Sequence, residues 1–447
     1  MQAVLLFIMV TAVFAGIASG IPVIFVLLGV PILAAIAGSL AGVFDFSLLS
    51  AIPPRVFGIM GNQILYAVPL FILMGKLLEH SGLAKRGLFA FTGLFGQSPK
   101  ALSFTVIGVS VAIACASGIV GATITMLGAI ALPAMQRFQF SERFCAGLIT
   151  ASGSLGQIIP PSIALILLSD QISGAHVANQ LANGNFAPDP ISVGHLFAGA
   201  LIPGLCLAAA YAVYASSIPG GARVPDTPNG KDGVPVTTDW PGRLVILSLF
   251  LVPASILLGF VTATEASAVG VLIAGSFALL AKPDKVVPAL KESVELTGVI
   301  FGIIVAASVF SLVLRGFEGD VWVALMFSQL PEGGHWALLL VMLVVFLLGF
   351  LLEFVEITYV VVPIVAPVLF ALGIDPVWFA VLMVVNLQIS FLTPPMGISL
   401  FYYKSVAEIR TIELYRAVVP FICIQLLLLV FLYLFPPLAT WLPSVLI

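Results

Sequence analysis

Residues 151–168, ASGSLGQIIPPSIALILL, form an apolar stretch almost long enough to cross a bilayer, yet the proline pair Pro160 and Pro161 lies near its centre. Lipid cannot satisfy backbone N–H and C=O groups, so chains span membranes only as helices or closed barrels. Proline removes a backbone donor and interrupts the helical hydrogen bonds. Such a break is tolerated only where protein, water or a bound ion interacts with the N–H and C=O groups that the break leaves without helical partners.

The rest of the chain is equally apolar. Of its 447 residues 61% are hydrophobic and only 8% are charged, and a water-soluble domain could not cover so much apolar surface. Apolar runs of about 17 to 25 residues recur from end to end, beginning with residues 1–20, which lack the basic leader of a signal peptide. The sequence therefore predicts an all-α polytopic membrane protein embedded in the lipid bilayer.

Basic residues gather in five connections between the apolar runs, and the positive-inside rule places these connections in the cytoplasm. The polar loop 169–195 and the turn LGIDP at 372–376 carry no lysine or arginine, so we expect both on the outer side. Tracing the chain gives about ten or eleven crossings with a periplasmic N-terminus. The basic connections lie at 76–100, 137–143, 223–243, 282–291 and 404–416.

Two apolar stretches do not fit as simple crossings. Residues 101–136 have basic segments at both ends, and each half is only about 15 residues long. This pattern predicts a re-entrant hairpin with its tip near Ser117, Gly118 and Gly121. Residues 335–372 repeat the arrangement, but with both ends on the outer side.

A second proline pair indicates an internal duplication. Pro394 and Pro395 interrupt the run NLQISFLTPPMGISLFYY, and the shift of 234 residues that aligns the two pairs also aligns Pro133 with Pro367. The tracing places an odd number of crossings between the two copies, so they should lie in opposite orientations. Inverted repeats of this kind are typical of secondary transporters.

The two breaks and the two hairpin tips should bring carbonyl and hydroxyl oxygens together near the membrane midplane. Oxygen ligands suit a hard cation such as Na⁺. The polar side chains near the breaks could instead form hydrogen bonds between helices, which is their usual role in membranes. The polar candidates are Ser152, Ser154 and Gln157 at the first break and Asn386, Gln388 and Ser390 before the second, and the breaks themselves are marked by Gly156, Pro160 and Pro161 and by Pro394, Pro395 and Gly397.

Three glutamates lie within or beside apolar runs. Glu353 and Glu356 fall on one helical face at the tip of the second hairpin, where a charge at the bilayer centre costs ~3 kcal/mol. Both could supply a carboxylate to a cation, or one or both could lie at a wet hairpin mouth. Glu265 follows Thr264 at the start of an apolar run, which favours a helix N-terminus capped by Thr264 over a role in transport.

Several function classes are disfavoured. The sequence contains no Walker A, GxSxG or HExxH motif, so we expect neither an ATP-driven pump nor an enzyme, and no nucleic-acid partner. A proton-translocating subunit of a respiratory complex could explain Glu353 and Glu356. Such a subunit would place lysine and histidine midway along several helices, whereas the basic residues here gather at connections.

Five segments together resemble the large membrane subunit of TRAP (tripartite ATP-independent periplasmic) transporters, and the resemblance covers essentially the whole chain. They are NQILYAVPLFILMGKLLEHSGLAKR, GSLGQIIPPSI, GFVTATEASAVG, LGFLLEFVEITYVVVPIVAPV and NLQISFLTPPMGISLF.

The resemblance implies a sodium-coupled, elevator-type carrier of the bacterial inner membrane. Its substrates would be small organic anions such as C4-dicarboxylates, 2-oxo acids or sugar acids. Its partners would be a small four-helix membrane subunit and a periplasmic substrate-binding protein. The alternative is a sodium/dicarboxylate symporter that needs no binding protein.

The resemblance also implies two Na⁺ sites. The first uses Ser117 and Gly118 with Gly156, Ile158 and Pro161, and the second uses Glu353 with Thr393, Pro394 and Met396. Many relatives carry aspartate where Glu353 stands here, and the polar insert 173–195 is longer than in many of them.

The chain accordingly divides into two transport repeats and a scaffold. We expect scaffold helices and a first arm at 1–100; a first repeat at 101–172, with its hairpin at 101–136 and broken helix at 142–172; a periplasmic loop, scaffold helices and a second arm at 173–334; a second repeat at 335–404, with its hairpin at 335–372 and broken helix at 376–404; and a scaffold helix at 405–447. The arms are the amphipathic segments 82–96 and 317–330.

Overall fold

A computed structural model describes residues 1–82, 98–117, 120–218, 251–331 and 334–447. The described residues form helices joined by turns and contain no strand, as the sequence predicts. The first arm, expected at 82–96, lies almost wholly outside these residues.

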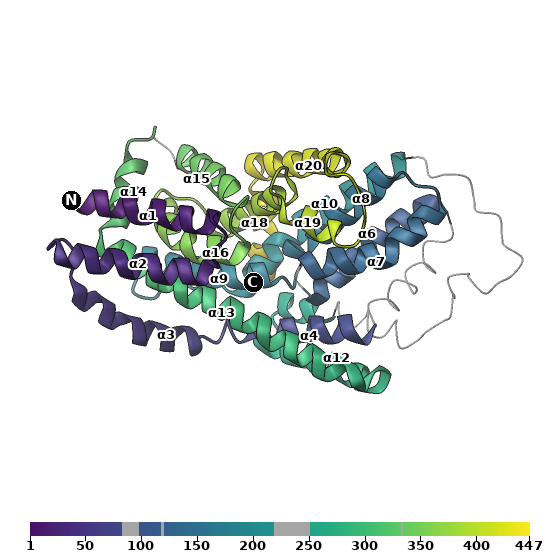
Figure 1. Cartoon of the computed structure of the whole chain (residues 1–447), viewed down its shortest axis with the longest axis horizontal. Coiled ribbons are helices and arrows are strands. Elements are labelled where there is room, and N and C mark those ends of the chain that lie inside the picture. The colour runs from purple at the N-terminus through teal and green to yellow at the C-terminus, as the bar shows by residue number, and fades with distance from the viewer. Residues whose placement is uncertain (83–97, 118–119, 219–250, 332–333) are drawn as a thin grey trace, which may run out of the picture.

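One set of helices packs around the 31-residue helix α13, which contacts α2, α3 and α4. Helix α12 packs along α4, and α1 packs on α2. We call this set the first helix group (Figure 1). Its members are α1 (Gln2–Ala18), α2 (Val23–Leu40), α3 (Ile52–Met60), α4 (Ala67–Ser81), α12 (Ala263–Ala281) and α13 (Val286–Gly316).

The second helix group holds both hairpins and both broken helices. It meets the first group where α4 packs on α6 and α9, and where α13 packs on α16. Its members are α6 (Pro99–Ser117), α7 (Val120–Arg137), α8 (Glu142–Ser154), η2 (Leu155–Gln157), α9 (Ile163–Ala182), α10 (Val193–Ser217), α15 (His335–Leu348), α16 (Phe354–Val360), α17 (Val362–Ala371), α18 (Pro376–Leu392), α19 (Ile398–Lys404), α20 (Thr411–Leu434) and α21 (Pro437–Leu446).

Both helix breaks lie where the proline pairs predict them. The first separates α8 and η2 from α9, and the second separates α18 from α19. Both hairpins are also present: α6 packs on α7, and α15 is followed by α16 and α17, which are bent 54° to each other.

The two repeats also begin alike. Ser141 caps α8, its hydroxyl accepting from the Phe144 N–H at 3.3 Å, and Asp375 caps α18, its carboxylate accepting from the Trp378 N–H at 2.8 Å. These caps are related by the same shift of 234 residues as the proline pairs. The duplication therefore extends to the residues that start each broken helix.

Helices α10 and α20, which fall in the segments 173–334 and 405–447 expected to hold scaffold helices, lie against the broken helices. Helix α10 contacts α6, α9 and α18, and α20 contacts α8 and α18. Both helices therefore cover the broken helices directly, and they belong by contact to the second helix group. That they move with it is a prediction about transport.

The N-terminus of α12 corrects one expectation. Thr262, not Thr264, is the cap: its hydroxyl accepts from the Glu265 N–H at 3.3 Å, and the Glu265 carboxylate accepts from the Thr262 N–H at 2.8 Å. The two bonds form a reciprocal capping box, in which Glu265 is the third residue of the helix. From the sequence we expect it to be the first, directly after a cap at Thr264. Thr264 instead donates to the Gln63 carbonyl at 2.8 Å.

Five described helices have the length and apolarity of membrane spans, namely α2, α10, α12, α20 and the segment Pro283–Gly316 that contains α13, and the bent pair α16 and α17 could form a sixth. The other apolar helices of the described residues are arms of the hairpins, halves of the broken helices, or helices of 17 residues or fewer. A count of the long helices therefore does not test the predicted number of membrane crossings.

Candidate functional site

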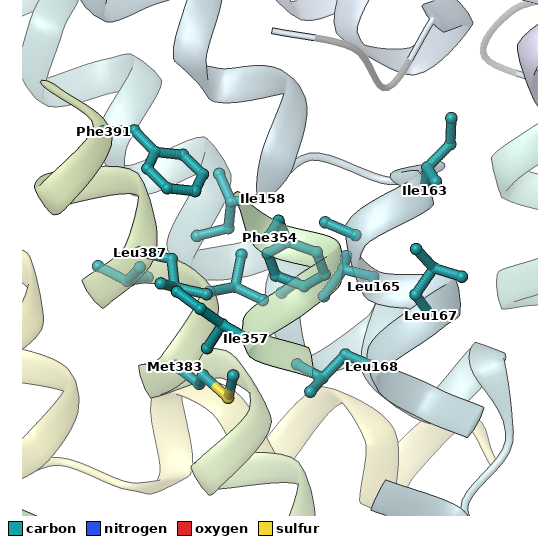
Figure 2. Packing of buried hydrophobic residues seen from close by; sticks show 14 of the residues in the cluster. Ile158, Ile163, Leu165, Leu167, Leu168, Phe354, Ile357, Met383, Leu387 and Phe391 are labelled. Carbon is teal, nitrogen blue, oxygen red and sulfur yellow. The ribbon is translucent and has the colours of Figure 1, made fainter. Parts of the chain in front are cut away.

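The two repeats meet at the first break. Figure 2 shows Ile158 of the break, Leu165 and Leu168 of α9, Phe354 and Ile357 of α16, and Met383, Leu387 and Phe391 of α18 packed together. Residues of the second hairpin and the second broken helix therefore pack against the first break, which α6 and α7 of the first hairpin also contact.

One hydrogen bond joins the repeats directly. The Gln388 amide nitrogen donates to the Ser154 hydroxyl at 3.1 Å, and both side chains are fully buried. The two residues are 234 positions apart, so they occupy equivalent places in the two copies. Equivalent residues of an inverted repeat can touch only near its two-fold axis, so this bond marks that axis.

Buried oxygens around the first break lack hydrogen-bond partners within the described residues. They are Ser152 Oγ, Gln157 Oε1, Ser162 Oγ and Gln388 Oε1. Buried polar atoms of native proteins are nearly always paired, so several unpaired acceptors at one break indicate a place for water, an ion or a ligand. Ser162 was not among the predicted residues, although its position directly after the proline pair could have identified it.

Asn386 and Thr393 have structural partners. The Asn386 amide donates to the Met342 carbonyl of α15 at 2.6 Å, and the Thr393 hydroxyl donates to the Ile389 carbonyl of its own helix at 2.7 Å. Asn386 therefore links α18 to the second hairpin, in agreement with the alternative role of polar membrane side chains. The Thr393 carbonyl remains a candidate ligand.

Glycines allow the hairpins to approach the broken helices closely. A Cβ on Gly121 would lie 2.6 Å from the Tyr402 ring of α19, and a Cβ on Gly349 would lie 2.1 Å from Ser390 Oγ of α18. Gly121 thus lies one residue into α7 and packs the first hairpin against the second broken helix. Gly118 lies outside the described residues, as does the side chain of Ser117, which ends α6.

The glutamates of the second hairpin have different environments. Glu353 occupies the N-cap position of α16 and is exposed. Glu356 is only 3% exposed, its Oε2 has no partner in the described part of the chain, and it borders a small cavity lined by Val13, Phe310 and other apolar side chains. The suggestion that Glu356 lies at a wet hairpin mouth is therefore wrong, because α1 and α13 cover it.

The two breaks also differ in exposure. The first break, from Leu155 to Ser162, is buried throughout. At the second break Pro395 and Met396 are exposed, the latter to 46%. The Tyr415 hydroxyl of α20 donates to the Pro395 carbonyl at 2.9 Å, which satisfies one group freed by the break.

Comparison with known proteins agrees with this architecture. The family model described as "Tripartite ATP-independent periplasmic transporter, DctM component" matches residues 9–438. The C4-dicarboxylate TRAP transporter large permease protein DctM of Rhodobacter capsulatus is 30% identical over 391 residues, which cover 85% of this chain and 87% of that protein. The sialic acid TRAP transporter large permease protein SiaM of Vibrio cholerae is 28% identical over 436 residues, which cover 96% of each chain.

A solved structure shows the same fold. The crystal structure of the Alcanivorax borkumensis YdaH transporter matches with a TM-score of 0.64 and 13% identity, over 88% of this chain and 90% of that one.

Proposed function

We propose, because this chain belongs to the DctM component family of tripartite ATP-independent periplasmic transporters, that it performs sodium-coupled uptake of a small organic anion. Membership makes the chain a multi-pass membrane permease and not an enzyme, and it confirms the family that the five sequence segments resemble. The proposal adds the coupling ion, the substrate class and the elevator movement. The membrane would be the bacterial inner membrane, with the N-terminus in the periplasm.

The set of unpaired buried oxygens at the first break carries the proposal. Ser152, Gln157, Ser162 and Gln388 contribute these atoms from both repeats. Oxygens without protein partners are suitable ligands for a hard cation or its water. The expected first sodium site, at Ser117, Gly118, Gly156, Ile158 and Pro161, would adjoin these oxygens at the same break; of its residues, Gly118 lies outside the part of the chain that the structure describes.

The second sodium site would use the exposed Glu353 together with Thr393, Pro394 and Met396. Gly349 of the same hairpin tip lies against Ser390, three residues before Thr393, so the tip and the second break adjoin. A carboxylate at this position would offset the charge of the ion where it enters from solvent.

The substrate would be a carboxylate. The family members named above transport C4-dicarboxylates and sialic acid, both of which carry carboxylates. Ser162 occupies the N-cap position of α9 but makes no side-chain cap bond, so the first N–H groups of this helix are available to an anion. Movement of the second helix group along the first would then carry anion and sodium across the membrane.

Uptake into proteoliposomes tests this function. The vesicles would contain the permease and its small four-helix membrane partner, with candidate periplasmic binding proteins added under an imposed Na⁺ gradient. Uptake that requires both sodium and a binding protein supports the proposal and identifies the substrate. Sodium-driven uptake without a binding protein favours the stand-alone symporter. Uptake that does not depend on the sodium gradient contradicts both the proposal and the symporter alternative.

A further inference from the structure

Asp170 is a carboxylate of α9 that the proposed sodium and substrate sites do not use. It lies seven residues after the first residue of α9, about 10 Å along the helix from the first break. Its carboxylate accepts three hydrogen bonds: Oδ1 from the Asn62 amide at 2.5 Å, and Oδ2 from the Gln171 amide at 2.8 Å and the Tyr359 hydroxyl at 3.0 Å. All three donors are neutral. They compensate part of the cost of partly burying a charge.

The donors come from both helix groups. Asn62 belongs to the link between α3 and α4 in the first group, whereas Tyr359 lies on α16, in the second hairpin. The link is itself held in place, because the Asn62 side-chain oxygen accepts from the Ile64 N–H at 3.0 Å and the Gln63 carbonyl accepts from Thr264 of α12 at 2.8 Å. Asn62 is therefore a fixed donor at the edge of the first group.

The bond between Asn62 and Asp170 crosses an interface that is apolar at the second hairpin apart from the buried Glu356, whose Oε2 has no hydrogen-bond partner in the described part of the chain. There Val13 of α1 and Phe310 of α13 lie beside Leu352 and Val360 around one small cavity. The long-range side-chain bonds described above within the second group, from Gln388 to Ser154 and from Asn386 to Met342, do not cross this interface.

We infer that Asp170 is a positioning residue that fixes the second helix group in one register on the first. Its bond to Tyr359 stays within the second group and holds the hairpin on α9. Its bond to Asn62 must break whenever the groups slide past each other and re-form when they return. The inference rests on the proposed elevator movement, and it assigns to Asp170 a role apart from sodium and substrate.

Exchanging the two side chains tests the pairing. In Asn62→Asp two carboxylates face each other, so the initial uptake rate should fall by roughly tenfold. In the double variant Asn62→Asp with Asp170→Asn the donor and acceptor are reversed and the bond is restored, so uptake should recover to within about threefold of the parent. A double variant no faster than Asn62→Asp alone would overturn the inference.

The stability of the same variants can be measured without a transport assay. The unfolding temperature of the purified permease should fall in Asn62→Asp and recover in the double variant, and failure to recover contradicts the pairing. Tyr359→Phe, which leaves the Asn62 bond intact, serves as a control for general destabilisation of this cluster. If the unmodified permease showed no sodium-driven uptake, the proposed function would fail while this measurement still decided the pairing.

Cross-linking tests whether the two groups separate at this point. A short bis-methanethiosulfonate should join Asn62→Cys and Asp170→Cys through two disulfides in the absence of substrate. The cross-link should arrest uptake, and its reduction should restore uptake. Each single-cysteine variant controls for the four native cysteines. Cross-linked permease that transports at the rate of the reduced protein would show that the groups do not part here.

Discussion

At the scale of single residues, the second break depends on a glycine as much as on its prolines. The chain folds back on itself after Pro395, so that a Cβ on Gly397 would lie 2.7 Å from the Phe391 carbonyl oxygen and 3.0 Å from that of Thr393. Both neighbours are backbone atoms and cannot turn away as a flexible side chain can. The carbonyl of Thr393, a proposed sodium ligand, therefore keeps its place partly because residue 397 has no side chain.

We expect Gly397→Ala to destabilise the permease by about 1 to 3 kcal/mol, the usual cost of forcing atoms into filled space, and to abolish uptake. Gly174→Ala in α9 is the matched control, because a Cβ there meets nothing within 4 Å and alanine favours a helix. The unfolding temperature reports the loss of stability, and the uptake assay reports the loss of transport, in each of the two variants. Equal stability of the two variants would mean that the second break relaxes freely.

Glu353 allows a second test at this scale. Glu353→Gln removes the proposed carboxylate ligand while keeping its size, so the Na⁺ concentration for half-maximal uptake should rise about tenfold, equivalent to ~1.4 kcal/mol. Glu408→Gln, an exposed residue beyond α19, should leave it unchanged. An unchanged sodium dependence in Glu353→Gln would remove Glu353 from the second site.

At the scale of elements, the broken helices α8 and α18 act as one paired unit. They start with equivalent caps, Ser141 and Asp375, and they touch through the equivalent residues Ser154 and Gln388. Helix α20 packs on both. A substitution that shifts one broken helix should therefore also displace the other at the axis of the repeat, where the proposed ligands lie.

A double-mutant cycle measures that coupling. Ser154→Ala and Gln388→Leu should each lower stability, and their combined effect should fall short of the sum by about 1 kcal/mol, the net value of one buried hydrogen bond. Ser110→Ala removes a hydroxyl that bonds only within its own helix, at 2.9 Å to the Val106 carbonyl, so its effect should add to that of Gln388→Leu. Additivity of Ser154→Ala would show that the central bond contributes nothing.

At the scale of the whole molecule, two helix groups meet along α4, α6 and α9 and along α13 and α16. The first break is buried, whereas Pro395 and Met396 of the second break and Glu353 are exposed. The two proposed sites thus differ in exposure in the described conformation. Alternation between buried and exposed states is the working requirement of a carrier.

The orientation of the molecule can be checked by labelling. In a variant without the native cysteines, Ala187→Cys in the loop free of basic residues should react with a membrane-impermeant maleimide in intact spheroplasts. Ser405→Cys, in the basic connection 404–416, should react only after the membrane is opened. Both positions are exposed, so labelling in the reverse pattern would invert the predicted topology.

The sequence by itself determined the membrane class, the duplication, the two breaks and the family, because each follows from local properties. Apolar run length, the missing donor of proline and the recurrence of both at one spacing can be read without knowing which helices touch. Only the tertiary structure decided that α10 and α20 cover the broken helices, that Glu356 is sealed by α1 and α13, and that Asn62 meets Asp170. These pairings join residues far apart in the chain, and among many equally apolar helices no local pattern specifies which faces will pack together.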